Sequence, residues 1–250
     1  MATHTHTGAT AFDGAELAYE RARPGYALEA LLTALLLAGC GDLGDVADLA
    51  AGTGKLTRVL APHASSIVAI EPSAAMREAF RLALPDVEVI GGRAEQIPLP
   101  DGSLDLVAVG EAFHWFRPVP AIAEIARVLR PGGALLVARN EVRSDAAPWL
   151  ARVYAERSGR RVRRPGLNWR RALEQSAQFE GFCEAAKPHD QQLTNDALVD
   201  LSRSMSRVNA LGPEARDAYL ARLRELVDEH APQPLIVPYR TRAVAARRRG

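Results

Sequence analysis

The chain has 250 residues, of which 48% are hydrophobic and 24% are charged, values ordinary for a globular protein with a buried core. The formal net charge of +1 argues against a nucleic-acid or anionic-membrane partner, and six scattered histidines give no metal-ligand spacing. Cys40 and Cys183 are far apart, no signal-peptide pattern opens the chain, and the most apolar run, residues 30–40, is too short to span a bilayer. We therefore expect a cytoplasmic protein without a metal, a nucleic-acid partner or a membrane partner.

Apolar runs typical of buried strands alternate with helical segments between residues 45 and 139. In chain order, the predicted elements are a helix over 27–38, a strand over 45–50, a helix over 53–60, a strand over 66–70, a helix over 73–84, strands over 87–90 and 104–110, a helix over 118–129 stopped by residues 130–133, and a strand over 134–138. This alternation predicts an α/β fold with a doubly wound, mostly parallel sheet covered by helices on both faces.

The pattern changes after residue 140. Helices are expected within 144–172 and over 196–211 and 213–230, strands over 182–193 and 235–244, and a basic tail over 247–250. We expect one domain over residues 1–250, with a flexible tail at 1–10 and helical additions over 141–180 and 194–231 that form a substrate lid.

A turn of small residues, 50–54 (AAGTG), follows the first predicted strand and opens a helix whose free N–H groups favour a negative ligand group. A P-loop is excluded because Leu49 and Leu56 stand where Gly and Ser or Thr are required. A dinucleotide fingerprint is weakened by Thr57 at its third glycine. S-adenosylmethionine carries no pyrophosphate and needs no third glycine, so it is the third ligand that such a turn accommodates.

Glu71 ends the second predicted strand, at the place where a ribose-binding acid falls in such folds. A carboxylate there can accept charge-assisted hydrogen bonds from both ribose hydroxyls. The alternative is a solvated acid at the start of a helix, just before Pro72.

Four motifs stand in the order and spacing of class I S-adenosylmethionine-dependent methyltransferases, which the chain resembles. They are residues 48–54 (DLAAGTG), 71–76 (EPSAAM), 92–105 (GRAEQIPLPDGSLD) and 127–133 (RVLRPGG). Three further patterns resemble the small-molecule branch that includes trans-aconitate methyltransferase-like proteins: residues 19–26, 114–116 (HWF) and 239–241 (YRT). Ala50 departs from the family pattern, which has glycine there. The resemblance implies a seven-stranded Rossmann-like sheet with an antiparallel C-terminal strand and a helical lid.

The resemblance also implies roles for individual residues around the cofactor. Glu71 binds the ribose, and Arg23 either closes over the cofactor's carboxylate or the substrate, or braces its own loop. The implied cofactor-binding residues are Tyr19, Arg23, Ala50, Gly52, Gly54, Glu71, Pro72, Met76, Ala94, Glu95, Gly110 and Glu111.

The segment after the fourth predicted strand holds the candidate catalytic residues, Glu111 and His114, and the candidate pocket residues, Trp115 and Phe116. A histidine side chain ordinarily titrates near neutral pH, so His114 could act as a general base, or could pack as a structural ring. A carboxylate acceptor needs no base, whereas a hydroxyl does. The arginines of residues 157–171 either bind an anionic substrate group or form a solvated loop.

These features predict methyl transfer from S-adenosylmethionine, released as S-adenosylhomocysteine, to a small-molecule acceptor. O-methylation of a carboxylate or hydroxyl is favoured by analogy with the branch named above. The alternatives are an NAD(P)-dependent Rossmann oxidoreductase and an adenosylmethionine-binding cyclase or isomerase that transfers no methyl group. We expect a monomer or a homodimer.

Overall fold

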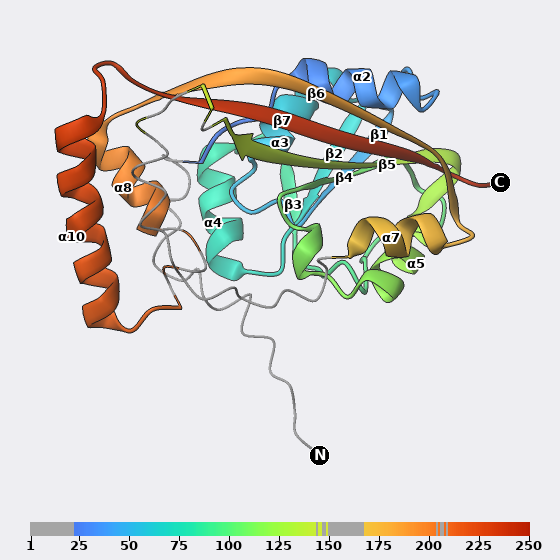
Figure 1. The fold of residues 1–250 in the computed structure, drawn as a ribbon. Coiled ribbons are helices and arrows are strands. Elements are labelled where there is room, and N and C mark those ends of the chain that lie inside the picture. Colours follow the sequence, from blue (N-terminus) through green and yellow to red (C-terminus); the bar gives the residue numbers. More distant parts are fainter. Residues whose placement is uncertain are drawn as a thin grey trace. The chain divides into compact units, whose positions relative to one another are not determined.

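The computed structural model describes residues 23–143, 145–146, 149, 168–203, 205, 208 and 210–250 (Figure 1). The tail predicted at 1–10, Tyr19 and the arginines from 157 to 164 lie outside the described residues. The chain divides into two compact units, each of which is described by itself. The sheet unit comprises Gly25–Glu141, Arg164–Lys187 and Thr241–Gly250, and the small unit comprises Met1–Pro24, Val142–Arg163 and Pro188–Arg240. The predictions of one domain and of a substrate lid stay predictions.

Helices and strands alternate along the chain as the sequence predicts. The elements are α2 (Leu28–Leu37), β1 (Asp45–Leu49), α3 (Lys55–Leu60), η1 (Ala61–His63), β2 (Ser66–Ile70), α4 (Ala74–Ala83), β3 (Glu88–Ile90), β4 (Leu104–Gly110), η2 (Phe113–Trp115), α5 (Pro118–Val128), β5 (Leu129–Val142), α7 (Trp169–Gln175), β6 (Phe179–Leu193), α8 (Asn195–Arg203), α10 (Pro213–His230) and β7 (Leu235–Arg248).

The strands form one seven-stranded sheet in the order β3-β2-β1-β4-β5-β7-β6. The pairs β1–β2, β2–β3, β1–β4 and β4–β5 are parallel. The C-terminal part is antiparallel, because β7 runs back along β5 (Figure 1). The predicted α/β class and mixed sheet are therefore confirmed.

Local sequence explains where the helices start. The Ser73 side chain accepts a hydrogen bond from the N–H of Met76 at 3.3 Å and so caps α4. Proline occupies the first turn of both α5 and α10, where its fixed φ is favourable and its missing N–H costs nothing.

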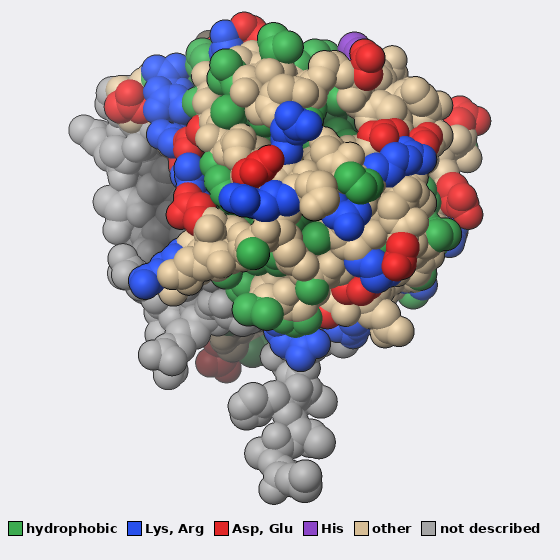
Figure 2. Space-filling view, turned by 90° about the vertical axis from the view of Figure 1, so that its right-hand side faces the viewer, with side chains coloured by type: hydrophobic (Ala, Val, Ile, Leu, Met, Phe, Trp, Pro, Cys, Tyr) green, Lys and Arg blue, Asp and Glu red, His purple; other side chains and the backbone are tan. Residues whose placement is uncertain are grey.

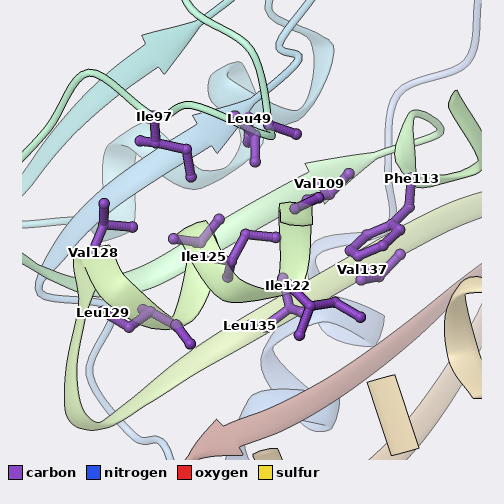
Figure 3. Packing of buried hydrophobic residues seen from close by; sticks show 14 of the residues in the cluster. Leu49, Ile97, Val109, Phe113, Ile122, Ile125, Val128, Leu129, Leu135 and Val137 are labelled. Atoms are coloured by element: carbon purple, nitrogen blue, oxygen red, sulfur yellow. The ribbon is translucent and has the colours of Figure 1, made fainter. Parts of the chain in front are cut away.

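Two hydrophobic clusters cover the two faces of the sheet in the sheet unit. On one face, α5 and α7 pack on the strands, and Figure 3 shows Ile122, Ile125 and Val128 of α5 beside strand residues such as Val109. On the other face, residues of α2 and α3 pack against the opposite side of β1, β4 and β5. β4 is covered on both faces, so most of its residues are buried. This explains why its sequence is a nearly continuous apolar run.

A third cluster fills the small unit. It joins buried residues of α8 and α10 to the first half of β7, including Leu198, Leu223 and Val237. The helix predicted over residues 213–230 is confirmed as α10, whose buried side comprises Leu220, Leu223, Leu226 and Val227.

Two details of the prediction were wrong at the C-terminal strands. Residues 130–133 do not separate helix from strand, because β5 begins at Leu129 and pairs with β4 through a register shift between Leu104 and Leu106. The basic end of the chain is no tail, since β7 continues to Arg248, whose guanidinium donates to the carbonyl of Leu129. Backbone pairing, which apolar periodicity does not report, determines both ends.

Figure 2 shows one face of the molecule, on which basic and acidic side chains are interspersed without a large patch of one sign. Arg170 and Arg242, for example, both pair with Glu184, at 2.7 and 2.6 Å. Among the described residues, no helix is long and apolar enough to cross a membrane.

Candidate functional site

The candidate site lies at the carboxyl ends of β1 and β4, in the sheet unit. The strand order reverses there: β2 and β3 continue from β1 in one direction, and β5 continues from β4 in the other. Open α/β sheets bind ligands at this kind of switch point, because the loops that follow the two strands diverge to opposite faces.

Two strained residues mark this point. Among the described residues, Ala50 and Glu111 are the non-glycine positions with positive φ, at 59° and 54°. The β1–β4 register pairs Asp48 with Ala108, so its continuation brings Ala50 level with Gly110, next to Glu111. A left-handed backbone costs an ordinary residue about 1–2 kcal/mol, and such strain is concentrated at functional sites. The glycine that the family pattern has at position 50 would adopt this conformation without that cost.

Glu71, the residue after β2, is buried and holds the glycine turn. One carboxylate oxygen accepts from the N–H of Gly52 at 2.9 Å, and the other accepts from the N–H of Ser73 at 2.9 Å. Burial raises the pKa of Glu71, while the two N–H donors and the charge of Arg77 oppose that rise. The carboxylate is therefore held in place, and each oxygen still has a lone pair for a further donor.

Asp48, the penultimate residue of β1, is fully buried below the same turn. Burial raises the pKa of Asp48 to about 7, against an opposing hydrogen bond from Thr57, and the nearby charge of Glu71 adds to the rise. The Thr57 hydroxyl donates to one carboxylate oxygen at 2.5 Å. Within the described residues, the other oxygen and the buried Thr53 hydroxyl have no hydrogen-bond partner. Sequence reasoning treated Thr57 as a missing glycine and overlooked its bond to Asp48.

The two glycines of the turn differ in what surrounds them. A side chain at Gly52 would meet nothing within 4 Å, so the space in front of the turn is open. A Cβ at Gly54 would lie 2.6 Å from Leu84 and 2.8 Å from Phe80, both on the α4 side. Glycine at position 54, where φ is 90°, is thus required by the packing of α3 on α4.

Arg77 of α4 holds the loop that carries Glu71. Its guanidinium donates to the carbonyls of Glu71 and Pro72, at 2.8 and 2.9 Å. Met76, one residue earlier, is buried. Pro72 and Met76 therefore lie on the segment that Arg77 fixes. The role of Arg77 was not predicted from the sequence, because a helix-surface arginine has no distinctive pattern.

The loop before β4 carries Ala94 and Glu95. Ala94 is buried in the core, and the Glu95 carboxylate accepts from the N–H of Arg117 at 2.8 Å, just before α5. Arg127 of α5 fixes the rest of the loop by donating to the carbonyls of Ile97 and Leu99, at 2.8 and 2.9 Å. The adenine-side roles of Ala94 and Glu95 stay predictions.

The aromatic segment after β4 forms η2. The half-buried His114 ring lies 5.0 Å from the Trp115 ring, centroid to centroid. Phe116 is buried in the core, 5.1 Å from Phe113, whereas Trp115 packs at the edge of that core. The choice between a base and a packed ring for His114 therefore stays open, and so do the pocket roles of its two neighbours.

Arg23 is half-buried and belongs to the small unit, whereas Ala50, Gly52, Gly54, Glu71, Pro72, Met76, Ala94, Glu95, Gly110, Glu111 and His114 all belong to the sheet unit. Arg170 and Arg171 are the described members of the arginine-rich stretch, and Arg170 forms ion pairs with Glu174 and Glu184. Across the described part of the chain, no three His, Cys, Asp or Glu side chains gather in a way that could hold a metal ion.

Comparisons with known proteins agree with this geometry. The family description "Methyltransferase domain" matches residues 47–137, which contain the glycine turn, Glu71 and η2. An uncharacterized methyltransferase of Mycobacterium tuberculosis is 36% identical over 239 residues, covering 94% of each chain. An uncharacterized methyltransferase-like protein of Schizosaccharomyces pombe is 33% identical over 214 residues, covering 83% of this chain and 82% of its own.

Solved structures agree on the fold. A candidate type II methyltransferase from Anaeromyxobacter dehalogenans matches with a TM-score of 0.67 and 23% identity, covering 91% of this chain and 97% of that one. The YcgJ protein of Bacillus subtilis matches with a TM-score of 0.56 and 20% identity, covering 89% and 99%. The chain is therefore a member of the methyltransferase family, with the Rossmann-like fold of class I methyltransferases.

Proposed function

We propose that the protein transfers a methyl group from S-adenosylmethionine to a small-molecule acceptor. The observation that carries this proposal is the pair of buried carboxylates, Asp48 and Glu71, beside an open small-residue turn at the switch point of the sheet. Family membership favours methyl transfer over the oxidoreductase alternative.

The residues at the switch point fit this cofactor. The unpartnered oxygen of Asp48 and the unpartnered hydroxyl of Thr53 are buried polar atoms, which cost free energy unless a ligand or water satisfies them. A cofactor with an ammonium group and a sulfonium group suits buried carboxylates, whereas a dinucleotide pyrophosphate would be repelled. The open space at Gly52 gives room for the ligand beside the backbone.

Bound adenosylmethionine would supply the methyl group and the leaving group of an in-line displacement. Glu71 would accept from the ribose hydroxyls while Gly52 and Ser73 hold its carboxylate. Gly110 and Glu111, the second of which has a left-handed backbone, would lie below the sulfonium.

The acceptor is proposed to be a carboxylate or a hydroxyl of a small molecule. A carboxylate is already nucleophilic, so His114 would orient it. A hydroxyl would need a base, and a half-buried imidazole beside Trp115 is a suitable one. We also propose a cytoplasmic protein, as the two widely spaced free cysteines suit a reducing compartment, and a monomer or homodimer.

Calorimetry with adenosylmethionine and NAD tests the cofactor. Wild-type protein should bind the former and not the latter. Glu71→Gln should weaken adenosylmethionine binding by about 1–3 kcal/mol, the scale of lost hydrogen bonds to a charged group. Because Glu71 also holds the turn, the test includes an adenosylmethionine analogue without the ribose 2′-hydroxyl.

The analogue separates ribose recognition from support of the turn. It should bind wild type more weakly than adenosylmethionine does, and Glu71→Gln should bind the two equally. Glu88→Gln, an exposed glutamate on β3, serves as the matched control. Equal affinity of wild type for the two ligands would remove the ribose assignment.

A turnover assay tests transfer itself. Adenosylhomocysteine is released only if the methyl group is transferred to the carboxylate or hydroxyl acceptor. A cyclase or isomerase would convert its substrate without releasing adenosylhomocysteine. If His114 is a base, His114→Ala should lower kcat by about 100-fold or more. An unchanged kcat and pH profile would assign His114 to packing.

A further inference from the structure

A hydrogen-bond network joins three distant segments of the sheet unit beside Glu111. The Thr241 hydroxyl, on β7, donates to the side-chain oxygen of Asn140 at 2.7 Å. The Asn140 backbone N–H donates to the Glu111 carboxylate at 2.5 Å. Thr241 is fully buried and Asn140 is partly buried, so the hydroxyl at the centre of this network has a well-defined position.

The same two side chains bind the backbone on both sides of Tyr26. The Asn140 amide donates to the carbonyl of Gly25 at 2.8 Å, and the Thr241 hydroxyl accepts from the N–H of Ala27 at 2.9 Å. Ala27 is the N-cap of α2 and its own side chain gives no cap. One amide and one hydroxyl therefore fix the residues before and after Tyr26.

The Tyr26 side chain lies against the end of β4. A Cβ at Gly110 would be 2.6 Å from the Tyr26 hydroxyl oxygen and 3.1 Å from the ring carbon that bears it. The same Cβ would be 3.3 Å from Leu56, near the start of α3. The missing side chain at Gly110 thus makes room for a phenol hydroxyl between the ends of β4 and α3.

We propose that Tyr26 contacts the methyl-donor end of the bound cofactor, and that Asn140 and Thr241 are positioning residues that hold it there. This inference rests on the function proposed above, which puts the sulfonium over Gly110 and Glu111. A phenol oxygen beside a sulfonium accepts weak C–H hydrogen bonds from the polarised carbons next to the positive sulfur. The neutral thioether of adenosylhomocysteine offers weaker ones.

The position of this oxygen must be fixed for such a contact to help. Methyl transfer requires in-line alignment, and small displacements of the donor cost large factors in rate. Asn140 also holds Glu111 through its backbone N–H, so this one residue supports two groups at the methyl-donor end. The network therefore supports the site and also connects the start of α2 to β5 and β7.

Calorimetric binding of adenosylmethionine and adenosylhomocysteine, without any acceptor, tests the proposal. Tyr26→Phe should lower the preference for adenosylmethionine over adenosylhomocysteine by about two- to fivefold, the worth of one or two weak hydrogen bonds. Thr241→Val keeps the shape, loses the hydroxyl and should lower the ratio similarly. Thr241→Ser keeps the hydroxyl and should restore the wild-type ratio.

The ratio of the two affinities distinguishes a lost contact with the sulfonium from a general structural defect, because such a defect weakens the binding of both ligands alike. Thr194→Val removes another hydroxyl that accepts a backbone N–H, at 3.1 Å in the small unit, and should leave the ratio unchanged. If Thr241→Val does not fold, Tyr26→Phe and Thr241→Ser still decide. An unchanged ratio in Tyr26→Phe would overturn this inference and leave the proposed function standing. Wild type that binds neither ligand would overturn the proposed function itself.

Discussion

Asp48 gives the protein a pH-dependent stability that one substitution should remove. Its pKa is raised from 3.8 to about 7 by burial. The unfolded chain therefore releases this proton at lower pH than the folded chain, and the stability present below pH 3.8 is lost as pH rises toward 7. At 1.36 kcal/mol per pKa unit, the loss is about 2 kcal/mol at pH 5 and about 4 kcal/mol at pH 8.

Asp48→Asn keeps an oxygen to accept from Thr57 and carries no charge. Relative to wild type, its free energy of unfolding should rise by about 2–3 kcal/mol between pH 5 and pH 8. The measurement is urea unfolding at pH 5, 6, 7 and 8, followed by circular dichroism. Asp86→Asn, an exposed carboxylate, controls for the removal of any single charge. A constant difference between Asp48→Asn and wild type across this range would refute the argument.

Four further substitutions test the backbone strain at the glycine turn, the packing around it and the anchoring of the loop that contains residues 97–103. Ala50→Gly should stabilise the protein by about 1 kcal/mol, because φ is 59° there, whereas Ala51→Gly next to it should destabilise it by about 0.5–1 kcal/mol; thermal unfolding measures both. Gly54→Ala should lower the free energy of unfolding, measured with urea, by about 2–4 kcal/mol, because its Cβ would lie 2.6 Å from the Leu84 side chain. Arg127→Lys should increase hydrogen exchange in residues 97–103, because an ammonium cannot reproduce a forked guanidinium bound to two carbonyls.

Much of the sheet could be predicted because its signals are local. Central strands such as 104–110 are apolar runs bounded by turn residues, and the observed bounds of β4 are the predicted ones. The start of β5 at Leu129 was not predictable in this way. Proline and glycine at 131–133 normally interrupt a strand, and only pairing with β4 reveals that they belong to one.

In the candidate site, too, residues with a local sequence signal were predicted and residues that act through distant contacts were not. The turn and Glu71 were identified because they are contiguous motifs with fixed spacing. Thr57, Asn140 and Thr241 were not, because their contribution is a hydrogen bond to a residue 9, 29 or 214 positions away. A single sequence shows no sign of such pairs, since serine, threonine and asparagine occupy many solvated positions that look identical.

The two ends of the parallel strands differ in how their charges are satisfied. At the amino ends, Arg130 bridges Asp45 and Asp105 at 3.0 and 2.6 Å, so each carboxylate has a cation. At the carboxyl ends, Asp48 and Glu71 are buried near each other, and burial raises the pKa of both.

The strained backbones of Ala50 and Glu111 lie at that same carboxyl edge. A fold selected only for stability would not concentrate buried charge and backbone strain at one edge while neutralising the other. The asymmetry is explained if a cationic ligand completes the carboxyl edge. It follows that a cationic ligand should stabilise the protein more than a neutral analogue at the same free concentration, which thermal unfolding with adenosylmethionine and adenosylhomocysteine can measure.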